Sequence, residues 1–96
     1  MTQAFDLTVG VPTLNEEGSL RQILPRLKET FVRLGLRGEI IVVDGRSTDK
    51  TIAVAEAGDA RVLTQTGRGL GGALREGLCA ASAPWVAVED ADGTHP

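Results

Sequence analysis

Three carboxylates stand close together near the end of the chain, directly after a short apolar run. The run covers residues 85–88, and Glu89, Asp90 and Asp92 follow it. Carboxylates at this spacing repel one another unless a cation lies beside them. A small number of hard oxygen ligands suits Mg²⁺ or Mn²⁺, completed by water and phosphate oxygens. The pattern predicts a divalent metal site on Asp90 and Asp92, and a solvated acidic turn is the structural alternative.

Asp44 is a further acid of interest because it comes directly after the apolar residues 40–43. Ser47 or Thr48, a few residues later, would explain part of this segment as a helix cap. Capping does not account for Asp44 itself, which could accept hydrogen bonds from a nucleobase or a ribose. We predict a nucleoside-binding role for Asp44, with a purely structural role as the alternative.

The segment PTLNEE follows the first apolar run of the sequence. Pro12 is expected to end a strand, and Asn15 or Ser19 is expected to cap a long helix. The acids Glu16 and Glu17 would complement the partial positive charge at the start of that helix, which explains them without a ligand.

The glycine-rich segment GRGLGG has two interpretations. Gly67, Gly69 and Gly72 satisfy G-x-G-x-x-G between a strand and a helix, which is the dinucleotide-binding pattern. That fingerprint normally opens its domain, whereas two strand–helix units precede it here, and it leaves the other polar segments without roles. In the other interpretation the glycines ease a turn, and Arg68 with the amides at the helix start faces a diphosphate.

The strands that must position these residues are visible as four apolar runs. The runs are continuous rather than alternating, as in parallel strands that are covered on both faces. They comprise residues 7–11, 39–43, 61–63 and 85–88.

Helical patterns separate the apolar runs. Gly35 is placed to end the first helix, and Pro25 should kink that helix or mark a late start near Ser19. A weaker, alanine-rich helix is expected over about residues 48–57. The first helix carries an apolar stripe of Leu20, Ile23, Leu24, Leu27, Phe31 and Leu34, and the last carries Leu70, Ala73, Leu74, Gly77, Leu78 and Ala81.

The alternation of strands and helices predicts an α/β fold with a parallel sheet of about four strands. Right-handed crossovers place helices on both faces of such a sheet. Ligands of open parallel sheets bind outside the carboxyl ends of the strands. Each of the four predicted strands is followed by one of the polar segments, so we expect the four segments to converge at one edge.

Composition narrows the function classes. The 96 residues allow one small domain, and the net charge of −3 comes from interleaved acids and bases, without a nucleic-acid-binding pattern. The single cysteine, Cys79, excludes an internal disulfide and a multi-cysteine metal site, and we expect it to be buried. No apolar stretch is long enough to span a bilayer, and the first residues lack the features of a signal peptide, so the expected compartment is the cytoplasm.

The four segments VGVPTLNEEGSL, EIIVVDGRSTDKT, GRGLGGALREG and VEDADGTHP, in this order and spacing, resemble the donor-binding half of a family 2 glycosyltransferase. Within that family they look most like the dolichol-phosphate or polyprenyl-phosphate sugar transferases. The resemblance covers nearly the whole chain. It implies a Rossmann-like GT-A fold that binds a nucleoside diphosphate sugar and transfers the sugar to a lipid phosphate or a saccharide. The alternatives are the dinucleotide-binding domain built on Gly67, Gly69 and Gly72, and a non-catalytic nucleotide-binding fragment that keeps the fold.

The resemblance also implies roles for residues. Those matching Pro12, Asn15 and Glu16 or Glu17 would line the nucleotide site, and the acid matching Asp44 would contact the base. Asp90 and Asp92 would form the D-x-D that reaches the ribose and a diphosphate bound to Mg²⁺ or Mn²⁺.

The chain departs from the family pattern at four positions. Gly45 and Arg46 stand where the family often has a second acid and then glycine, Lys50 replaces a common glycine, and Glu89 replaces an apolar residue. These departures bear on the base preference rather than on the fold.

Family members continue well beyond the D-x-D. We therefore expect residues 1–96 to be the nucleotide-sugar-binding part of a longer domain. The acceptor site and the general base would follow Pro96, the cytoplasmic face of a membrane would be a possible location, and His95 would be solvated.

Overall fold

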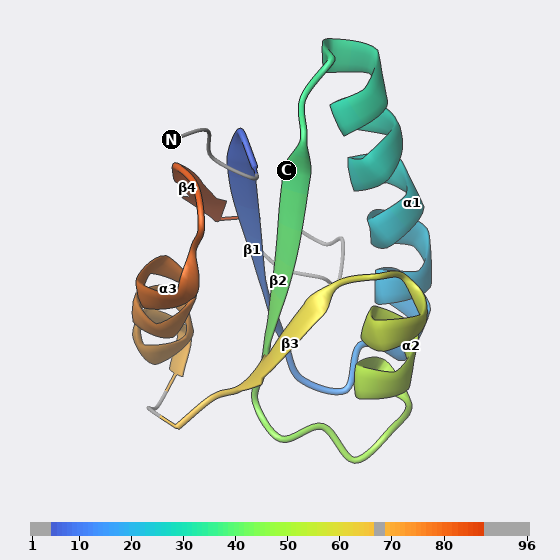
Figure 1. Ribbon diagram of the computed structural model, residues 1–96. Coiled ribbons are helices and arrows are strands. Elements are labelled where there is room, and N and C mark those ends of the chain that lie inside the picture. Colours follow the sequence, from blue (N-terminus) through green and yellow to red (C-terminus); the bar gives the residue numbers. More distant parts are fainter. Residues whose placement is uncertain (1–4, 67–68, 88–96) are drawn as a thin grey trace.

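The computed structural model describes residues 5–66 and 69–87 and shows a four-stranded parallel sheet (Figure 1). The strand order is β3-β2-β1-β4, with every neighbouring pair parallel. The strands are β1 (Leu7–Thr13), β2 (Gly38–Asp44), β3 (Arg61–Thr64) and β4 (Trp85–Ala87). The predicted α/β fold with about four parallel strands is confirmed.

Helices cover both faces of the sheet, also as predicted. Helices α1 (Glu17–Leu34) and α2 (Thr51–Ala57) lie on one face, and α3 (Gly69–Ala80) lies on the other (Figure 1). The chain winds outward from β1 to β3, and α3 then returns it to the far side of β1, where β4 pairs. The winding direction reverses between β1 and β4, which is the kind of position where doubly wound sheets bind ligands at the carboxyl ends of their strands.

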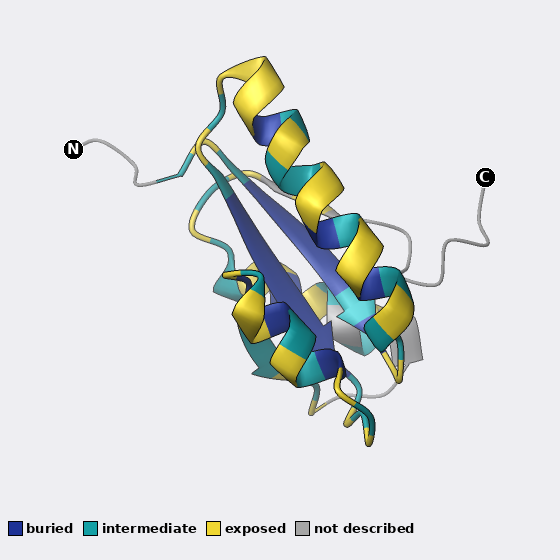
Figure 2. Ribbon diagram, turned by 90° about the vertical axis from the view of Figure 1, so that its right-hand side faces the viewer, coloured by how far each residue is buried: buried dark blue, intermediate teal, exposed yellow. Residues whose placement is uncertain are grey.

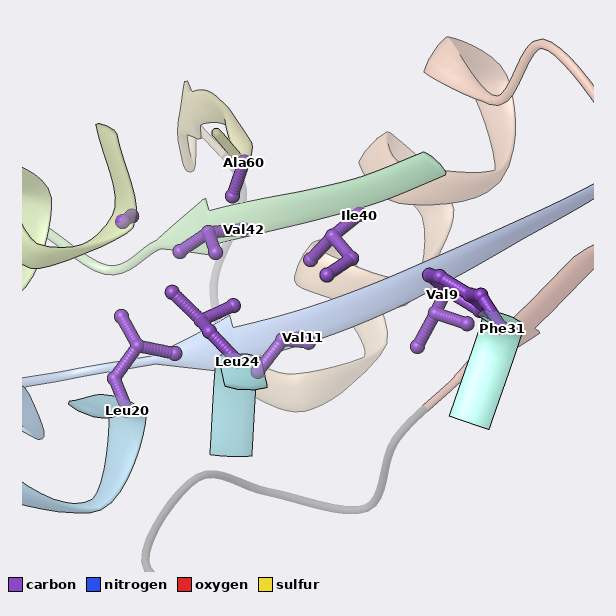
Figure 3. Close-up of a cluster of buried hydrophobic side chains, with 9 residues drawn as sticks. Val9, Val11, Leu20, Leu24, Phe31, Ile40, Val42 and Ala60 are labelled. Carbon is purple, nitrogen blue, oxygen red and sulfur yellow. The ribbon is translucent and has the colours of Figure 1, made fainter. Parts of the chain in front are cut away.

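The main core lies between the sheet and the α1–α2 layer. Alternate residues of β1 and β2 point toward α1, whose inner face is buried while its outer face is exposed (Figures 2 and 3). The cluster comprises Val9, Val11, Leu20, Leu24, Phe31, Ile40, Val42, Ala55 and Ala60. On the α3 side, Ile41 and Val43 form a smaller cluster with Leu63 and Ala80 packed against it. Strand β2 is therefore buried on both faces, which explains its unbroken apolar run.

Helix α1 ends at the predicted glycine, Gly35, and starts before Ser19, where one of the two predictions placed its start. Gly35 has φ 68°, and the N–H of Leu36 donates to the carbonyl of Phe31 at 2.9 Å, so this glycine closes the helix in the left-handed conformation. The helix begins at Glu17 and continues through the exposed Pro25, so the late start near Ser19 is wrong.

Pro12 does not end its strand, because β1 continues to Thr13. Proline has no N–H to donate to a neighbouring strand, so within a sheet it occurs where no strand pairs with that side of its backbone. The register of β4 reaches β1 only as far as Gly10, opposite Ala87. Pro12 therefore lies beyond the described part of that pairing.

Three side chains are more exposed than their patterns predict. Cys79 is exposed, because α3 turns Gly77 and Ala80 toward the sheet and leaves Cys79 on the outer side of the helix. Leu78 is 60% exposed, on that same outer side of α3, and Leu34 is 61% exposed at the last turn of α1. The prediction that Cys79 is buried is therefore wrong.

Candidate functional site

Two polar loops meet at the carboxyl edge of the sheet. The first (residues 14–16) joins β1 to α1, and the second (residues 45–50) joins β2 to α2, both at the lower edge in Figure 1. Strands β1 and β2 are neighbours whose last residues, Thr13 and Asp44, stand opposite each other. The chain therefore leaves both strands at the same level, and the two loops lie side by side.

The carboxylate of Asp44 is the centre of a hydrogen-bond network between these strands and loops. Its Oδ1 accepts from Thr13 Oγ1 at 2.8 Å and from Ser47 Oγ at 2.6 Å. Its Oδ2 accepts from the Ser47 N–H at 2.7 Å. The side chain has no exposed surface. Burial of a charged group without hydrogen bonds is strongly unfavourable, so these donors are what makes an acid acceptable after an apolar strand.

Asn15 connects the first loop to the second. Its Oδ1 accepts hydrogen bonds from the N–H groups of Thr48 at 2.7 Å and Asp49 at 3.3 Å. Its own N–H donates to Ser47 Oγ at 2.8 Å. Its backbone φ of 51° lies in the left-handed region, which asparagine tolerates better than most residues. Asn15 thus joins two loops rather than capping α1, whose N-cap residue is Glu16.

Asp49 performs the capping that the sequence assigned to its neighbours. Its Oδ1 accepts from the Thr51 N–H at 2.8 Å and from the Thr51 hydroxyl, and its Oδ2 accepts from the Glu17 N–H at 3.3 Å. One carboxylate thereby serves the first turns of both α1 and α2. The prediction that Ser47 or Thr48 caps the second helix is wrong, because that helix begins only at Thr51.

Hydrogen bonding also sets the ionisation of Asp49. The Thr51 hydroxyl has the largest effect and lowers the pKa of Asp49 from its ordinary value of 3.8. Backbone N–H donors lower this pKa further, against desolvation, which raises it. Asp49 is therefore ionised throughout the neutral pH range.

Glu16 takes part in the same framework. Its N–H donates to Thr51 Oγ1 at 2.9 Å, and its Oε1 accepts from the Leu14 N–H at 3.1 Å. The second contact closes a tight turn within the first loop. Pro12, Asn15, Glu16 and Asp44, which the sequence nominated for the nucleotide site, therefore lie together at the carboxyl edge.

The remaining predicted site residues lie outside the described part of the chain. These are Gly67, Arg68, Glu89, Asp90, Asp92 and His95. Within residues 5–66 and 69–87, no three His, Cys, Asp or Glu side chains form a group that could hold a metal. Gly69 begins α3, and Gly72 lies in its first turn. The metal role of the D-x-D stays a prediction.

Sequence reasoning missed Thr13, Thr51 and Asp49, which hold the framework together. Thr13 looks like an ordinary strand residue until the pairing of β1 with β2 places it opposite Asp44. Asp49 carried a weak signal, since Asp is a good N-cap residue and stands two residues before α2.

A doubly wound parallel sheet with interlocked polar loops at its carboxyl edge is the framework on which α/β proteins bind nucleotides and related ligands. The chain matches the family described as "Glycosyl transferase family 2" over residues 8–96. It therefore belongs to this family, and the match favours the transferase interpretation over a dinucleotide-binding domain.

Individual relatives support the assignment. An uncharacterised glycosyltransferase of Mycobacterium tuberculosis H37Rv is 40% identical over 88 residues, which cover 92% of this chain and 37% of that protein. A dolichyl-phosphate hexose transferase of Haloferax volcanii is 35% identical, over 95% of this chain and 38% of that protein. The chain thus spans little more than a third of the length of these two relatives.

A solved structure shows the same fold. Glucosyl-3-phosphoglycerate synthase from Mycobacterium tuberculosis, in complex with Mn²⁺, UDP and glucosyl-3-phosphoglycerate, aligns with a TM-score of 0.67 and 28% identity. The alignment covers 86% of this chain and 33% of that one. The described part of the present chain contains no helix long and apolar enough to cross a membrane.

Proposed function

We propose that this chain is the donor-binding part of a glycosyltransferase that takes a hexose from a nucleoside diphosphate sugar and transfers it to an acceptor. The observation that carries the proposal is the family match over residues 8–96. The interlocked loops at the carboxyl edge support it, because they bring four nominated nucleotide-site residues together. The similar synthase was solved with UDP and Mn²⁺ bound.

The proposed roles follow the positions of the segments. The framework around Asn15, Glu16 and Asp44, with Pro12, forms the nucleoside side of the site. Arg68 would contact the diphosphate, and Asp90 with Asp92 would hold Mg²⁺ or Mn²⁺, for which paired carboxylates are suitable ligands. When bound, the cation would stabilise the negative charge that develops on the departing diphosphate.

The proposed acceptor is a polyprenyl or dolichyl phosphate. The relative from Haloferax volcanii, named as a dolichyl-phosphate hexose transferase, is what suggests this class. An oxygen of the lipid phosphate would form a bond to the anomeric carbon of the sugar while the bond from that carbon to the nucleoside diphosphate breaks. Such an acceptor would place the reaction at the cytoplasmic face of a membrane.

Residues 1–96 are proposed to bind the donor without completing the transfer. The chain covers 37% and 38% of two relatives, which leaves most of their length for an acceptor site and a general base. Transfer requires an acceptor held in line with the anomeric carbon. Residues 1–96 produced alone should therefore show no transfer above background, whereas the full-length gene product should turn over repeatedly. Robust turnover by residues 1–96 would refute this division.

Calorimetric titration of the full-length gene product with UDP and GDP, with Mn²⁺ or with chelator, tests donor and metal binding. Asp92→Asn should lose the metal-dependent part of the affinity, on the order of 1–3 kcal/mol. Asp59→Asn makes the same chemical change at an exposed position outside the site and is the matched control. Equal affinity with Mn²⁺ and with chelator would rule out the metal role.

A transfer assay identifies the acceptor. Sugar-labelled donor is incubated with a polyprenyl phosphate, with 3-phosphoglycerate or with neither. Labelled lipid is the expected product. Labelled phosphoglycerate without labelled lipid would refute the lipid acceptor while leaving the transferase function in place. A fluorescence titration with NADH, expected to show no binding, tests the dinucleotide alternative.

A further inference from the structure

Asp44 has little capacity left for a ligand. Both of its carboxylate oxygens accept hydrogen bonds from Thr13 and Ser47, and the side chain is 0% exposed. A nucleobase could reach it only if the network of Thr13 and Ser47 opened. The geometry instead suits a group that holds the second loop in place, so the contact with the base must come from a neighbour.

Arg46 is the neighbour whose backbone is unusual. Its φ of 71° lies in the left-handed region, which is unfavourable for residues other than glycine. Hydrogen bonds on both sides impose this conformation, because the Gly45 N–H donates to the Thr13 carbonyl at 2.8 Å and Ser47 is fixed to Asp44. An arginine kept in a strained conformation suggests a function for its side chain.

The side chain of Arg46 is available to a ligand. The residue is exposed. Within the described ranges 5–66 and 69–87, its guanidinium forms no ion pair with a carboxylate. A guanidinium carries five N–H donors and no acceptor, so its ligand must offer acceptor atoms.

The side chains of Leu14 and Gln65 lie beside the backbone of Gly45, next to Arg46. A Cβ built on Gly45 would lie 3.7 Å from Leu14 Cδ1, 3.7 Å from Gln65 Oε1 and 3.3 Å from the Thr13 carbonyl oxygen. Backbone without a side chain therefore lies between Leu14 and Gln65, and Leu14 is 55% exposed although it is apolar. An apolar side chain beside bare backbone can cover the face of a planar ring, while donors at its edge contact exocyclic oxygens.

The strand order separates this surface from the proposed diphosphate position. The D-x-D follows β4, which pairs with β1 on the side away from β2. Arg46 follows β2, which has β3 as its other neighbour. A nucleoside diphosphate lying across the edge from β4 toward β2 would therefore bring its base, not its phosphates, to Arg46.

We infer that Arg46 reads the nucleobase of the donor by donating hydrogen bonds to a ring carbonyl, and that Asp44 is a positioning residue that fixes the loop carrying Arg46. This inference rests on the proposed function. Uracil and guanine carry such a carbonyl oxygen, whereas adenine presents an amino group in its place. The chain therefore selects uridine or guanosine diphosphate donors over adenosine diphosphate donors.

Arg46→Gly is the informative variant, because glycine removes the guanidinium and also relieves the backbone strain. Calorimetry on the full-length gene product with Mn²⁺ should show affinity for UDP or GDP reduced about 10-fold, equivalent to about 1.4 kcal/mol. Affinity for ADP and for inorganic diphosphate should not change. The thermal midpoint should stay the same or rise, which distinguishes lost recognition from a damaged loop. Arg46→Asn, which also tolerates the left-handed region, should give the same binding pattern.

Asp59→Gly is the matched control, since Asp59 is a second exposed residue with positive φ (60°) and lies outside the two loops. It should leave all four affinities unchanged. If Arg46→Gly bound both UDP and GDP as tightly as the wild type does, the role of Arg46 would be refuted and the proposed function would stand. An equal loss for inorganic diphosphate would also overturn the inference, because Arg46 would then be a phosphate ligand. If the wild-type protein bound no nucleoside diphosphate, the proposed function itself would fail.

Discussion

Replacement of Asp44 is the most direct test of the framework at the carboxyl edge. Asp44→Ala removes three hydrogen bonds, from Thr13 Oγ1, Ser47 Oγ and the Ser47 N–H, and leaves that partly buried N–H without its acceptor. Hydrogen bonds to a charged group contribute about 1.5–3 kcal/mol each. Three bonds that share one carboxylate are not additive, and the loop relaxes in part. The free energy of unfolding should therefore fall by about 3–5 kcal/mol.

Asp44→Asn should have a smaller effect because the amide keeps the shape of the side chain. Its oxygen can accept from the rigid Ser47 N–H, and its amino group can donate to the hydroxyls of Thr13 and Ser47, which can rotate. The charge is lost, so we expect a decrease of about 1–2 kcal/mol. A free energy of unfolding that decreases from wild type to Asp44→Asn to Asp44→Ala is what a buried hydrogen-bond acceptor should give.

Urea unfolding of the full-length gene product, followed by far-ultraviolet circular dichroism, measures these differences. Asp59→Asn is the control, because the Asp59 side chain is 91% exposed and its one ion pair within residues 5–66 and 69–87 is with Lys28, at 3.5 Å. That variant should change the free energy of unfolding by less than about 0.5 kcal/mol. If Asp44→Ala were no more destabilising than Asp59→Asn, the hydrogen bonds accepted by Asp44 would not stabilise the fold, and the reasoning would be refuted.

Two further predictions concern stability. A Cβ on Gly38 would lie 2.2 Å from the Phe31 ring, so Gly38→Ala should lower the free energy of unfolding by about 1–3 kcal/mol. Gly18→Ala, where the added Cβ meets nothing within 4 Å, should instead raise it by up to about 1 kcal/mol, and urea unfolding compares the two. The depressed pKa of Asp49 stabilises the fold above the ordinary value of 3.8, and this contribution is lost as the pH falls through the folded-state pKa. Unfolding of wild type and Asp49→Asn across the acidic range should therefore converge at low pH, and parallel curves would contradict the assignment.

The order of elements was determined by the sequence alone. The apolar run 40–43 is unbroken because β2 is buried on both faces, and Gly35 ends α1 because it adopts φ 68°. These signals are local, since they depend on periodicity and on the backbone freedom of single residues. The motif order was also sufficient to indicate the family that the comparison over residues 8–96 confirms.

Helix caps and burial within α3 were not determined by the local pattern. Cys79 and Leu78 fit an apolar stripe, but the rotation of α3 that brings Gly77 and Ala80 to the sheet leaves them exposed. Asp49 serves two helices only because the folded chain places the start of α1 beside that of α2. Rotation and proximity are properties of packing, which no single segment encodes.

The hydrogen-bond partners of the side chains at the candidate site were decided by the tertiary structure. From the sequence, Asp44 was an acid at a strand end, predicted to contact a nucleoside, with a purely structural role as the alternative. The parallel register of β1 and β2 places Thr13 opposite Asp44, and the return of the second loop places Ser47 on it. A carboxylate surrounded by protein donors has its hydrogen-bonding capacity used within the fold. The sequence thus determined which residues gather at the edge. Strand register and loop closure determined which side chains have their hydrogen-bonding capacity used within the fold. Both depend on contacts between residues about thirty positions apart, which no local pattern encodes.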